Sequence, residues 1–103
     1  MNGKRQRGRG TTFHQYLRGE MKDSEYRRLY QEADIELRVA LEVTKAREAK
    51  KMSQRDLADA LHTKQQTVSR IERGAQNVTI ETLEKIARAL GRNLQVKFVV
   101  AGA

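Results

Sequence analysis

Apolar positions recur with helical spacing through most of the chain, and the recurrence is interrupted at residues that favour turns. A first short helix is predicted to begin at Ser53, whose hydroxyl can cap its N-terminus, and to end at His62–Thr63. A second ends at Gly74, a residue suited to a left-handed C-cap. A third is predicted from Thr79 to Gly91 by the same signals. The pattern therefore predicts three short helices with a tight turn after the first.

The second of these helices has a thin apolar side, made only of Val68 and Ile71, and Thr63 with Gln66 can form a capping box at its start. A helix with so few apolar side chains packs weakly, so its polar side is expected to serve another purpose. Gln can form bidentate hydrogen bonds to adenine, and Arg can do so to guanine. The layout and the polar side together predict a helix-turn-helix that reads DNA. That polar side carries Gln65, Gln66, Ser69, Arg70 and Arg73.

The segment from about Lys45 to Gly91 resembles the DNA-binding domain of the phage-repressor (Xre, lambda/434-type) helix-turn-helix family. The resemblance covers nearly half of the chain and involves many correlated positions. The matching residues are Arg47, Ser53–Gln54, Leu57–Ala58, the run Thr63–Gly74 and the pattern Leu83-x-x-Ile86-Ala87-x-Ala89-Leu90-Gly91. One departure is His62, where the family usually has Gly, because His adopts a positive φ less readily than Gly does.

The resemblance implies roles for individual side chains, with the helix Lys64–Arg73 lying in the major groove. Gln66 carries a conflict, because it can cap its own helix instead of reaching DNA. Arg47 of the preceding helix would pair with Glu72 and set the angle of the recognition helix. The residues that would read base edges are Gln65, Gln66, Ser69 and Arg70. The residues that would contact phosphates are Gln54, Lys64 and Arg73.

Composition agrees with an acidic partner such as double-stranded DNA. The chain has 103 residues, enough for one domain, and a formal net charge of +8. It contains no Cys, so neither a disulfide framework nor a Cys-based metal site is expected, and no cofactor is predicted. The basic N-terminus is not followed by an apolar segment, and no apolar run is long enough to span a bilayer. We therefore expect a cytoplasmic protein.

Catalysis by this chain is not expected. His14 and His62 lie in different helical units, and the chain has no Gly-rich phosphate loop, serine elbow or HExxH motif. The nearest approach to a metal site is Asp56, Asp59 and His62 at i, i+3 and i+6, which we interpret as a solvated helix face. The sequence therefore favours a binding protein over an enzyme.

Two segments precede the DNA-binding region. Residues 1–10 are basic and Gly-rich and are predicted to be a disordered arm, which either contacts DNA or, as we favour, stays solvated. Residues 11–34 carry a small excess of acidic side chains and are predicted to be a helical extension that binds a partner. Apolar spacing predicts one long helix from about Ser24 to Ala49, which can bend near Asp34.

The extension carries four of the five aromatic residues of the chain. Thr12 and Gln15 can open a short helix ahead of the long one. Two helices alone have few places to bury four rings, so a protein partner is favoured over internal packing alone. The run Phe13-x-x-Tyr16-Leu17, the pair Lys22-Asp23 and the stretch Tyr26–Tyr30 also resemble the N-terminal extension of HigA-type antitoxins, which silence a small RelE-like ribonuclease toxin. The toxin-binding residues that this resemblance implies are Phe13, Tyr16, Leu17, Tyr26, Leu29 and Tyr30.

Residues 93–100 (NLQVKFVV) alternate between apolar and other side chains and are rich in β-branched residues, so they are predicted to form a β-strand. No other strand is predicted, so its N–H and C=O groups need a partner. Pairing with its own copy across a two-fold axis is the simplest solution, and addition to the edge of a toxin's sheet is the runner-up. The strand residues that would form the dimer are Leu94, Val96, Phe98 and Val100.

The predicted fold is therefore an all-α, lambda-repressor-like bundle over residues 35–92, with the extension before it and a strand and tail at 93–103. Two functions follow, and both can hold for one chain. The first is a sequence-specific DNA-binding repressor that acts as a homodimer. The second is an antitoxin that neutralises a RelE/HigB-like toxin and autoregulates its operon. The alternative is a stand-alone phage-type regulator. A RelE-like toxin gene adjacent to this one would favour the antitoxin over that alternative.

Overall fold

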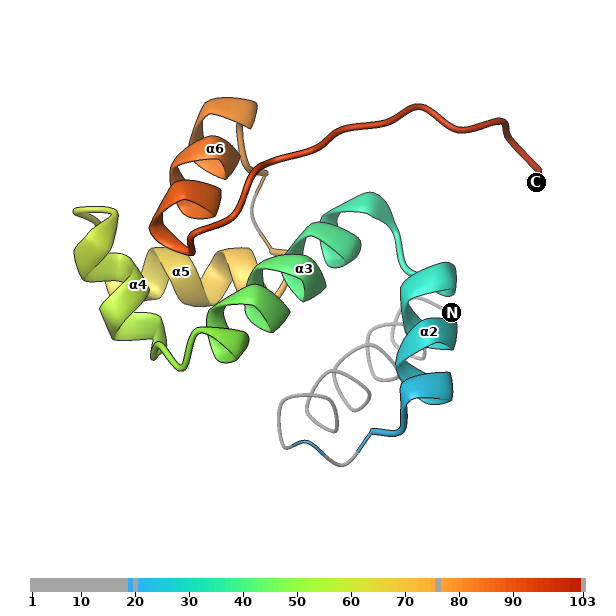
Figure 1. The fold of residues 1–103 in the computed structure, drawn as a ribbon, viewed down its shortest axis with the longest axis horizontal. Coiled ribbons are helices and arrows are strands. Elements are labelled where there is room, and N and C mark those ends of the chain that lie inside the picture. The colour runs from blue at the N-terminus through green and yellow to red at the C-terminus, as the bar shows by residue number, and fades with distance from the viewer. Residues whose placement is uncertain (1–18, 20, 76, 103) are drawn as a thin grey trace.

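The computed structural model describes residues 19, 21–75 and 77–102. These residues form the helices α2 (Asp23–Glu32), α3 (Ile35–Ala49), α4 (Gln54–Ala60), α5 (Gln65–Glu72) and α6 (Ile80–Ala89). Helices α3 to α6 form a bundle, and α2 lies against α3 at the end of the molecule opposite α4 (Figure 1). This arrangement confirms the predicted all-helical bundle in the described part of the chain. None of the helices in that part is long and apolar enough to cross a bilayer.

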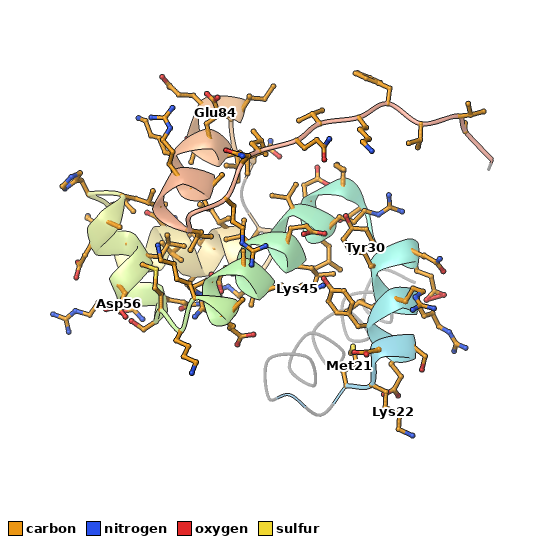
Figure 2. All side chains as sticks on the ribbon, viewed as in Figure 1. Met21, Lys22, Tyr30, Lys45, Asp56 and Glu84 are labelled. Carbon is orange, nitrogen blue, oxygen red and sulfur yellow. The ribbon has the colours of Figure 1, made fainter. Side chains whose placement is uncertain are left out.

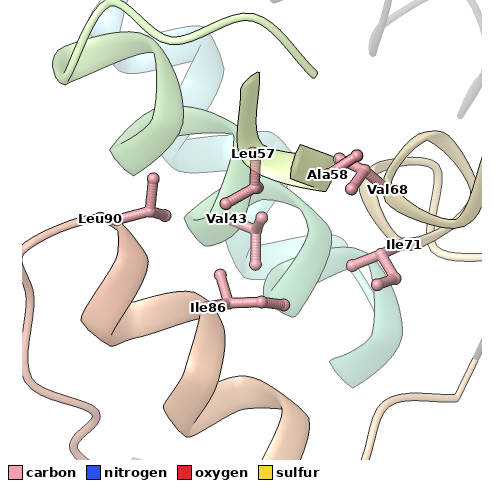
Figure 3. Close-up of a cluster of buried hydrophobic side chains, with 7 residues drawn as sticks. All are labelled: Val43, Leu57, Ala58, Val68, Ile71, Ile86 and Leu90. Carbon is pink, nitrogen blue, oxygen red and sulfur yellow. The ribbon is translucent and has the colours of Figure 1, made fainter. Parts of the chain in front are cut away.

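The main core lies where α3, α4, α5 and α6 meet, as Figure 3 shows. Its members lie on the apolar stripes that the helical spacing predicted, except Val43, which lies outside the predicted stripe of the long helix. Removing such side chains from water contributes about 1.5–3 kcal/mol for each large aliphatic residue. The buried members of this cluster are Val43, Leu57, Ala58, Val68, Ile71, Ile86 and Leu90.

The sequence predicted one long helix from about residue 24 to residue 49, but the structure divides it at Asp34. The Asp34 carboxylate accepts a hydrogen bond from the Leu37 amide at 2.9 Å and caps α3. Arg38 donates to two carbonyl oxygens in the last turns of α2, including that of Tyr30 at 2.9 Å. These bonds satisfy backbone groups on both sides of the break. The chain can therefore turn, and α2 packs against α3 instead of continuing it.

Residues 93–100 do not form the predicted strand. Within the described residues no strand is present, and the segment leaves α6 as an exposed tail (Figure 1). A strand needs the N–H and C=O groups of a neighbouring strand, and the helices of the described chain offer no open sheet edge. The large apolar side chains of the tail are exposed, Phe98 completely so at 101%.

Several predicted features fall outside the described residues. They are the basic arm at 1–10, the first part of the extension, and the side chains of Phe13, Tyr16 and Leu17.

Candidate nucleic-acid interface

The start of α4 is fixed by a reciprocal cap. The Ser53 hydroxyl accepts a hydrogen bond from the Asp56 amide, and the Asp56 carboxylate accepts one from the Ser53 amide, both at 2.9 Å. The hydrogen bonds that Asp56 receives, first from the Ser53 amide and then from its hydroxyl, lower the pKa of the Asp56 carboxyl below its usual range. The predicted N-cap at Ser53 is therefore confirmed.

The turn between α4 and α5 depends on a left-handed residue. His62 has φ +56°, in the region that favours Gly. The His62 amide donates to the carbonyl of Asp59 and the Thr63 amide to that of Ala58, which closes α4. The chain thus makes the predicted tight turn with His62 in a conformation that favours Gly.

Helix α5 begins one residue later than predicted. Lys64 is its N-cap, with φ −88° and ψ 148° and no side-chain cap, so the predicted capping box of Thr63 and Gln66 is wrong. The Thr63 amide is occupied in closing α4, which keeps Thr63 in the turn. As a result, Gln66 is not used to cap its own helix.

The residues predicted to read bases share the outward face of α5. Gln65, Gln66 and Arg70 are exposed and Ser69 is half-buried, while Val68 and Ile71 on the other side are buried in the core. Within the described chain, none of the four polar side chains is held by a hydrogen bond to another residue, so they remain available to a ligand. Lys64 and Arg73, predicted to contact phosphates, are exposed at the two ends of the helix.

Arg47 ties α3 to the far end of α5. Its Nε lies 2.7 Å from Glu72 Oε2, and its Nη2 donates to Glu72 Oε1 at 3.0 Å. Its Nη1 donates to the carbonyl of Met52 at 2.7 Å, just before α4. Glu72 is completely buried and Arg47 is 8% exposed. One guanidinium therefore positions both helices of the helix-turn-helix against α3.

Gln54 takes part in the same network. Its side-chain Nε2 donates to Glu72 Oε1 at 3.1 Å, and the side chain is half-buried. Gln54 was predicted from the sequence to contact a DNA phosphate. Its bond to Glu72 was not predicted, because the spacing of two residues in different helices does not reveal their distance. One N–H of the amide is thus engaged with Glu72.

Gly74 fixes the end of α5 against α3. Its φ is +68°, as a left-handed C-cap requires. A Cβ at this position would meet the Leu37 Cα at 3.4 Å and the Glu36 carbonyl group at 3.5 Å. The sequence predicted the backbone conformation, and the structure adds a second constraint, the close approach of two backbones.

The aromatic residues of α2 pack on α3. Tyr26 and Tyr30 have ring centroids 6.2 Å apart, and with Leu29 they cover Leu37 and two neighbouring buried residues of α3. Burial, and secondarily the charge of Glu42, raises the pKa of Tyr26 to about 12. These side chains therefore hold α2 in place, whereas the sequence favoured an external partner for them.

The exposed edges of the same rings line an open groove of about 660 Å³ between α2 and α3. The Lys45 Nζ lies 5.2 Å from the centre of the Tyr26 ring, and Figure 2 shows Lys45 on the side of α3 that faces α2. The Arg38 guanidinium lies 5.5 Å from the centre of the Tyr30 ring. The residues that line the groove are Asp23, Tyr26, Arg27, Tyr30, Gln31, Glu42 and Lys45.

Comparison with protein families finds a match over residues 43–97 to the family described as Helix-turn-helix. The chain belongs to this family. Membership confirms the resemblance to the Xre-type phage repressors and identifies this helix-turn-helix protein as a DNA-binding transcriptional regulator. The matched region begins within α3 and ends within the tail, so α2 lies outside it. No curated protein and no solved structure matches the chain.

Proposed function

We propose that this helix-turn-helix protein recognises a specific operator and represses transcription from it. The observation that carries the proposal is the outward face of α5, where Gln65, Gln66, Ser69 and Arg70 lie beside one another with no internal partner among the described residues. Side chains that can make bidentate contacts with bases are exposed on a helix that the core and the Arg47–Glu72 pair hold at a fixed angle.

In this proposal α5 lies in the major groove, and α4 crosses the DNA backbone. Gln65, Gln66, Ser69 and Arg70 read base edges. Gln54 and Lys64, at or beside the starts of the two helices, contact phosphates with Arg73 and fix the docking angle.

The protein acts as a homodimer in this proposal. A single module with a few base-reading side chains discriminates poorly among competing sites, whereas two modules on a two-fold axis read half-sites about 34–36 Å apart. The tail at 93–100 supplies the contact, since antiparallel pairing with its own copy would satisfy backbone groups that have no partner within the described chain.

The test is selection of binding sites from random duplex DNA, followed by fluorescence anisotropy on the enriched sequence. We expect a palindrome, and Arg70→Ala should weaken binding by about 1–3 kcal/mol and relax preference at one base pair. Arg88→Ala, an exposed Arg of α6, is the matched control and should bind as the unmodified protein does. Failure to enrich any sequence, or equal binding by Arg70→Ala, would contradict the assignment.

We further propose that the regulator is an antitoxin whose α2–α3 groove engages a small RelE/HigB-like ribonuclease toxin. Two observations favour it: α2 lies outside the family's matched region, and its tyrosine edges with charged residues of both signs line an open groove. Helix α2, which forms one wall of the groove, lies at the end of the molecule away from α4 (Figure 1), so one chain can hold toxin and operator together.

Because Tyr26 and Tyr30 also hold α2 on α3, their removal would confuse binding with folding. Arg27→Glu changes the groove, whereas Arg28→Glu makes the same change at an exposed neighbour that does not line it. On co-expression with a RelE/HigB-like toxin encoded beside the gene, Arg27→Glu should lose growth rescue and Arg28→Glu should keep it. If both variants rescue equally, the toxin binds somewhere other than this groove. If no such toxin is encoded there, or the unmodified chain gives no rescue, the chain is a stand-alone regulator.

A further inference from the structure

The described chain exposes its large apolar side chains in two places. One is the tail, with Phe98 at 101% exposure and Val96 at 64%. The other is the start of α3 and α6, where Ile35 is 66% exposed and Ile80 is 68% exposed. No large apolar side chain elsewhere in the described chain is as open. Isolated exposed apolar residues are ordinary, but grouped ones mark contact surfaces.

Ile35, but not Ile80, lines a groove. This groove has a volume of about 300 Å³ and runs between the first half of α3 and the segment that leads into α6. Its surface is mostly aliphatic, with Val39 and Leu83 half-buried and Ile35 at the rim. The lining residues are Ile35, Glu36, Val39, Ile71, Asn77, Val78 and Leu83.

Paired tails alone would not be stable. A two-stranded ribbon is marginally stable in water and needs a helix or a further strand against its apolar face. In a strand over 93–100, Leu94, Val96, Phe98 and Val100 would all point to one side. The groove offers an open aliphatic surface that can receive such a face.

Antiparallel pairing of two tails would place the end of each tail near the groove of the other copy. When two copies of residues 93–100 pair across a two-fold axis, the far end of one tail lies beside the start of the other. That start is next to the partner's own α6. At a rise of 1.5 Å per residue, Leu83 lies about 10 Å from the C-terminal end of α6. A few extended residues of the other copy's tail can span that distance. In the single chain, by contrast, the end of the tail runs away from the helices (Figure 1).

We propose that the groove between α3 and α6 of one protomer is the docking site for the end of the second copy's tail, with Phe98 as the main inserted side chain. The inference rests on the proposed homodimer and adds its second contact. Tail pairing supplies the backbone hydrogen bonds, and the exchanged groove contacts bury the apolar face of the ribbon. The orientation of the two recognition helices would then depend on α3, through which Arg47 already holds α5.

The absence of Cys from the sequence allows a direct test by disulfide trapping in the full chain. Ile35→Cys protein and a tagged Phe98→Cys protein are mixed, allowed to exchange subunits and oxidised. We expect a mixed disulfide species of intermediate mass on a non-reducing gel. Tagged Phe98→Cys mixed with Asp59→Cys, an exposed position on α4, is the control and should give little of it.

Three results would overturn the inference or its basis. If sedimentation finds a dimer but Ile35→Cys traps Phe98→Cys no better than Asp59→Cys does, the groove is not the docking site. If the Ile35→Cys/Phe98→Cys double variant closes a disulfide at monomer mass, the tail folds onto its own groove. If the unmodified chain is a monomer at all accessible concentrations, the proposed homodimer itself fails.

The Phe98→Cys substitution itself removes the ring that the proposal places in the groove, so a second measurement keeps Phe98 and alters the groove. Ile35→Glu, which leaves the tail intact, should raise the dimer dissociation constant at least tenfold. Ala60→Glu, at an exposed position on α4, should leave it unchanged. Equal dissociation constants for the two variants would also overturn the proposal.

Discussion

Arg47 and Glu72 lie side by side in the interior, joined by two hydrogen bonds of 2.7 and 3.0 Å from one guanidinium to one carboxylate. Arg47 comes from α3, and Glu72 is the last residue of the recognition helix. Gln54 adds a third donor to the carboxylate at 3.1 Å. Because Glu72 is fully buried, its charge depends on these donors and not on water.

Replacing Glu72 by Ala should therefore lower the free energy of unfolding by about 3–5 kcal/mol, because it leaves the Arg47 charge buried without its partner. Glu81→Ala removes a carboxylate from the exposed surface of α6 and should change stability by at most about 0.5 kcal/mol. Urea denaturation followed by circular dichroism measures both. Equal midpoints for the two variants would mean that the pair contributes no more than a surface charge does.

Thr44 is completely buried in α3, and its hydroxyl has no hydrogen-bond partner in the described chain. A buried polar group without a partner costs about 1–3 kcal/mol. Thr44→Val keeps the shape and removes the hydroxyl, so it should raise the free energy of unfolding by about 1 kcal/mol. The same substitution at Thr79, whose hydroxyl caps α6 by accepting from the Thr82 amide at 3.1 Å, should lower it by about 1 kcal/mol. A loss of stability at both positions would show that the Thr44 hydroxyl is satisfied.

His62 adopts φ +56°, where the Cβ of an L-residue is crowded. A left-handed residue costs about 1–2 kcal/mol, and Gly loses about 0.5–1 kcal/mol of extra chain entropy on folding. His62→Gly should therefore raise the free energy of unfolding by about 0.5–1 kcal/mol, the difference between these terms. Glu84→Gly, in the middle of α6, should lower it by a similar amount. Thermal melts of the two variants that shift in the same direction would contradict this reading of the turn.

Much of the DNA-binding region could be predicted from sequence because its signals are local. The caps at Ser53 and Thr79 and the left-handed residues at Gly74 and Gly91 each depend on the chain within a few residues, and the structure has all four. Most of the core was also predictable, since helical spacing fixes which side chains share a face. Two positions depart from the predicted stripes, because Ile80 is 68% exposed and Val43 is buried.

What could not be predicted depends on residues distant in sequence or on another chain. The break at Asp34 requires Arg38 to reach back to the end of α2, and periodicity carries no sign of that contact. The bond from Gln54 to Glu72 spans two helices. The tail residues have the alternation of a strand, but no partner lies within the described chain, so pairing remains a prediction.

The salt dependence of DNA binding can distinguish the residues of and beside α5 that are predicted to contact phosphates from those predicted to contact bases. Lys64 is exposed beside the first turn and is assigned to a phosphate, whereas Gln65 is assigned to a base edge. Lys64→Ala should weaken binding to all sequences alike and reduce the slope of log K against log salt by about 1, because one fewer counterion is released. Gln65→Ala should leave the slope unchanged and cost about 1–3 kcal/mol on the preferred site, with less discrimination at one base pair. Anisotropy titrations at four salt concentrations, on the preferred duplex and on single-base variants, measure both effects. Lys85→Ala, an exposed Lys of α6, should change neither quantity. If Lys64→Ala altered base preference and Gln65→Ala altered only the salt slope, the recognition helix would be docked in a different register from the one proposed.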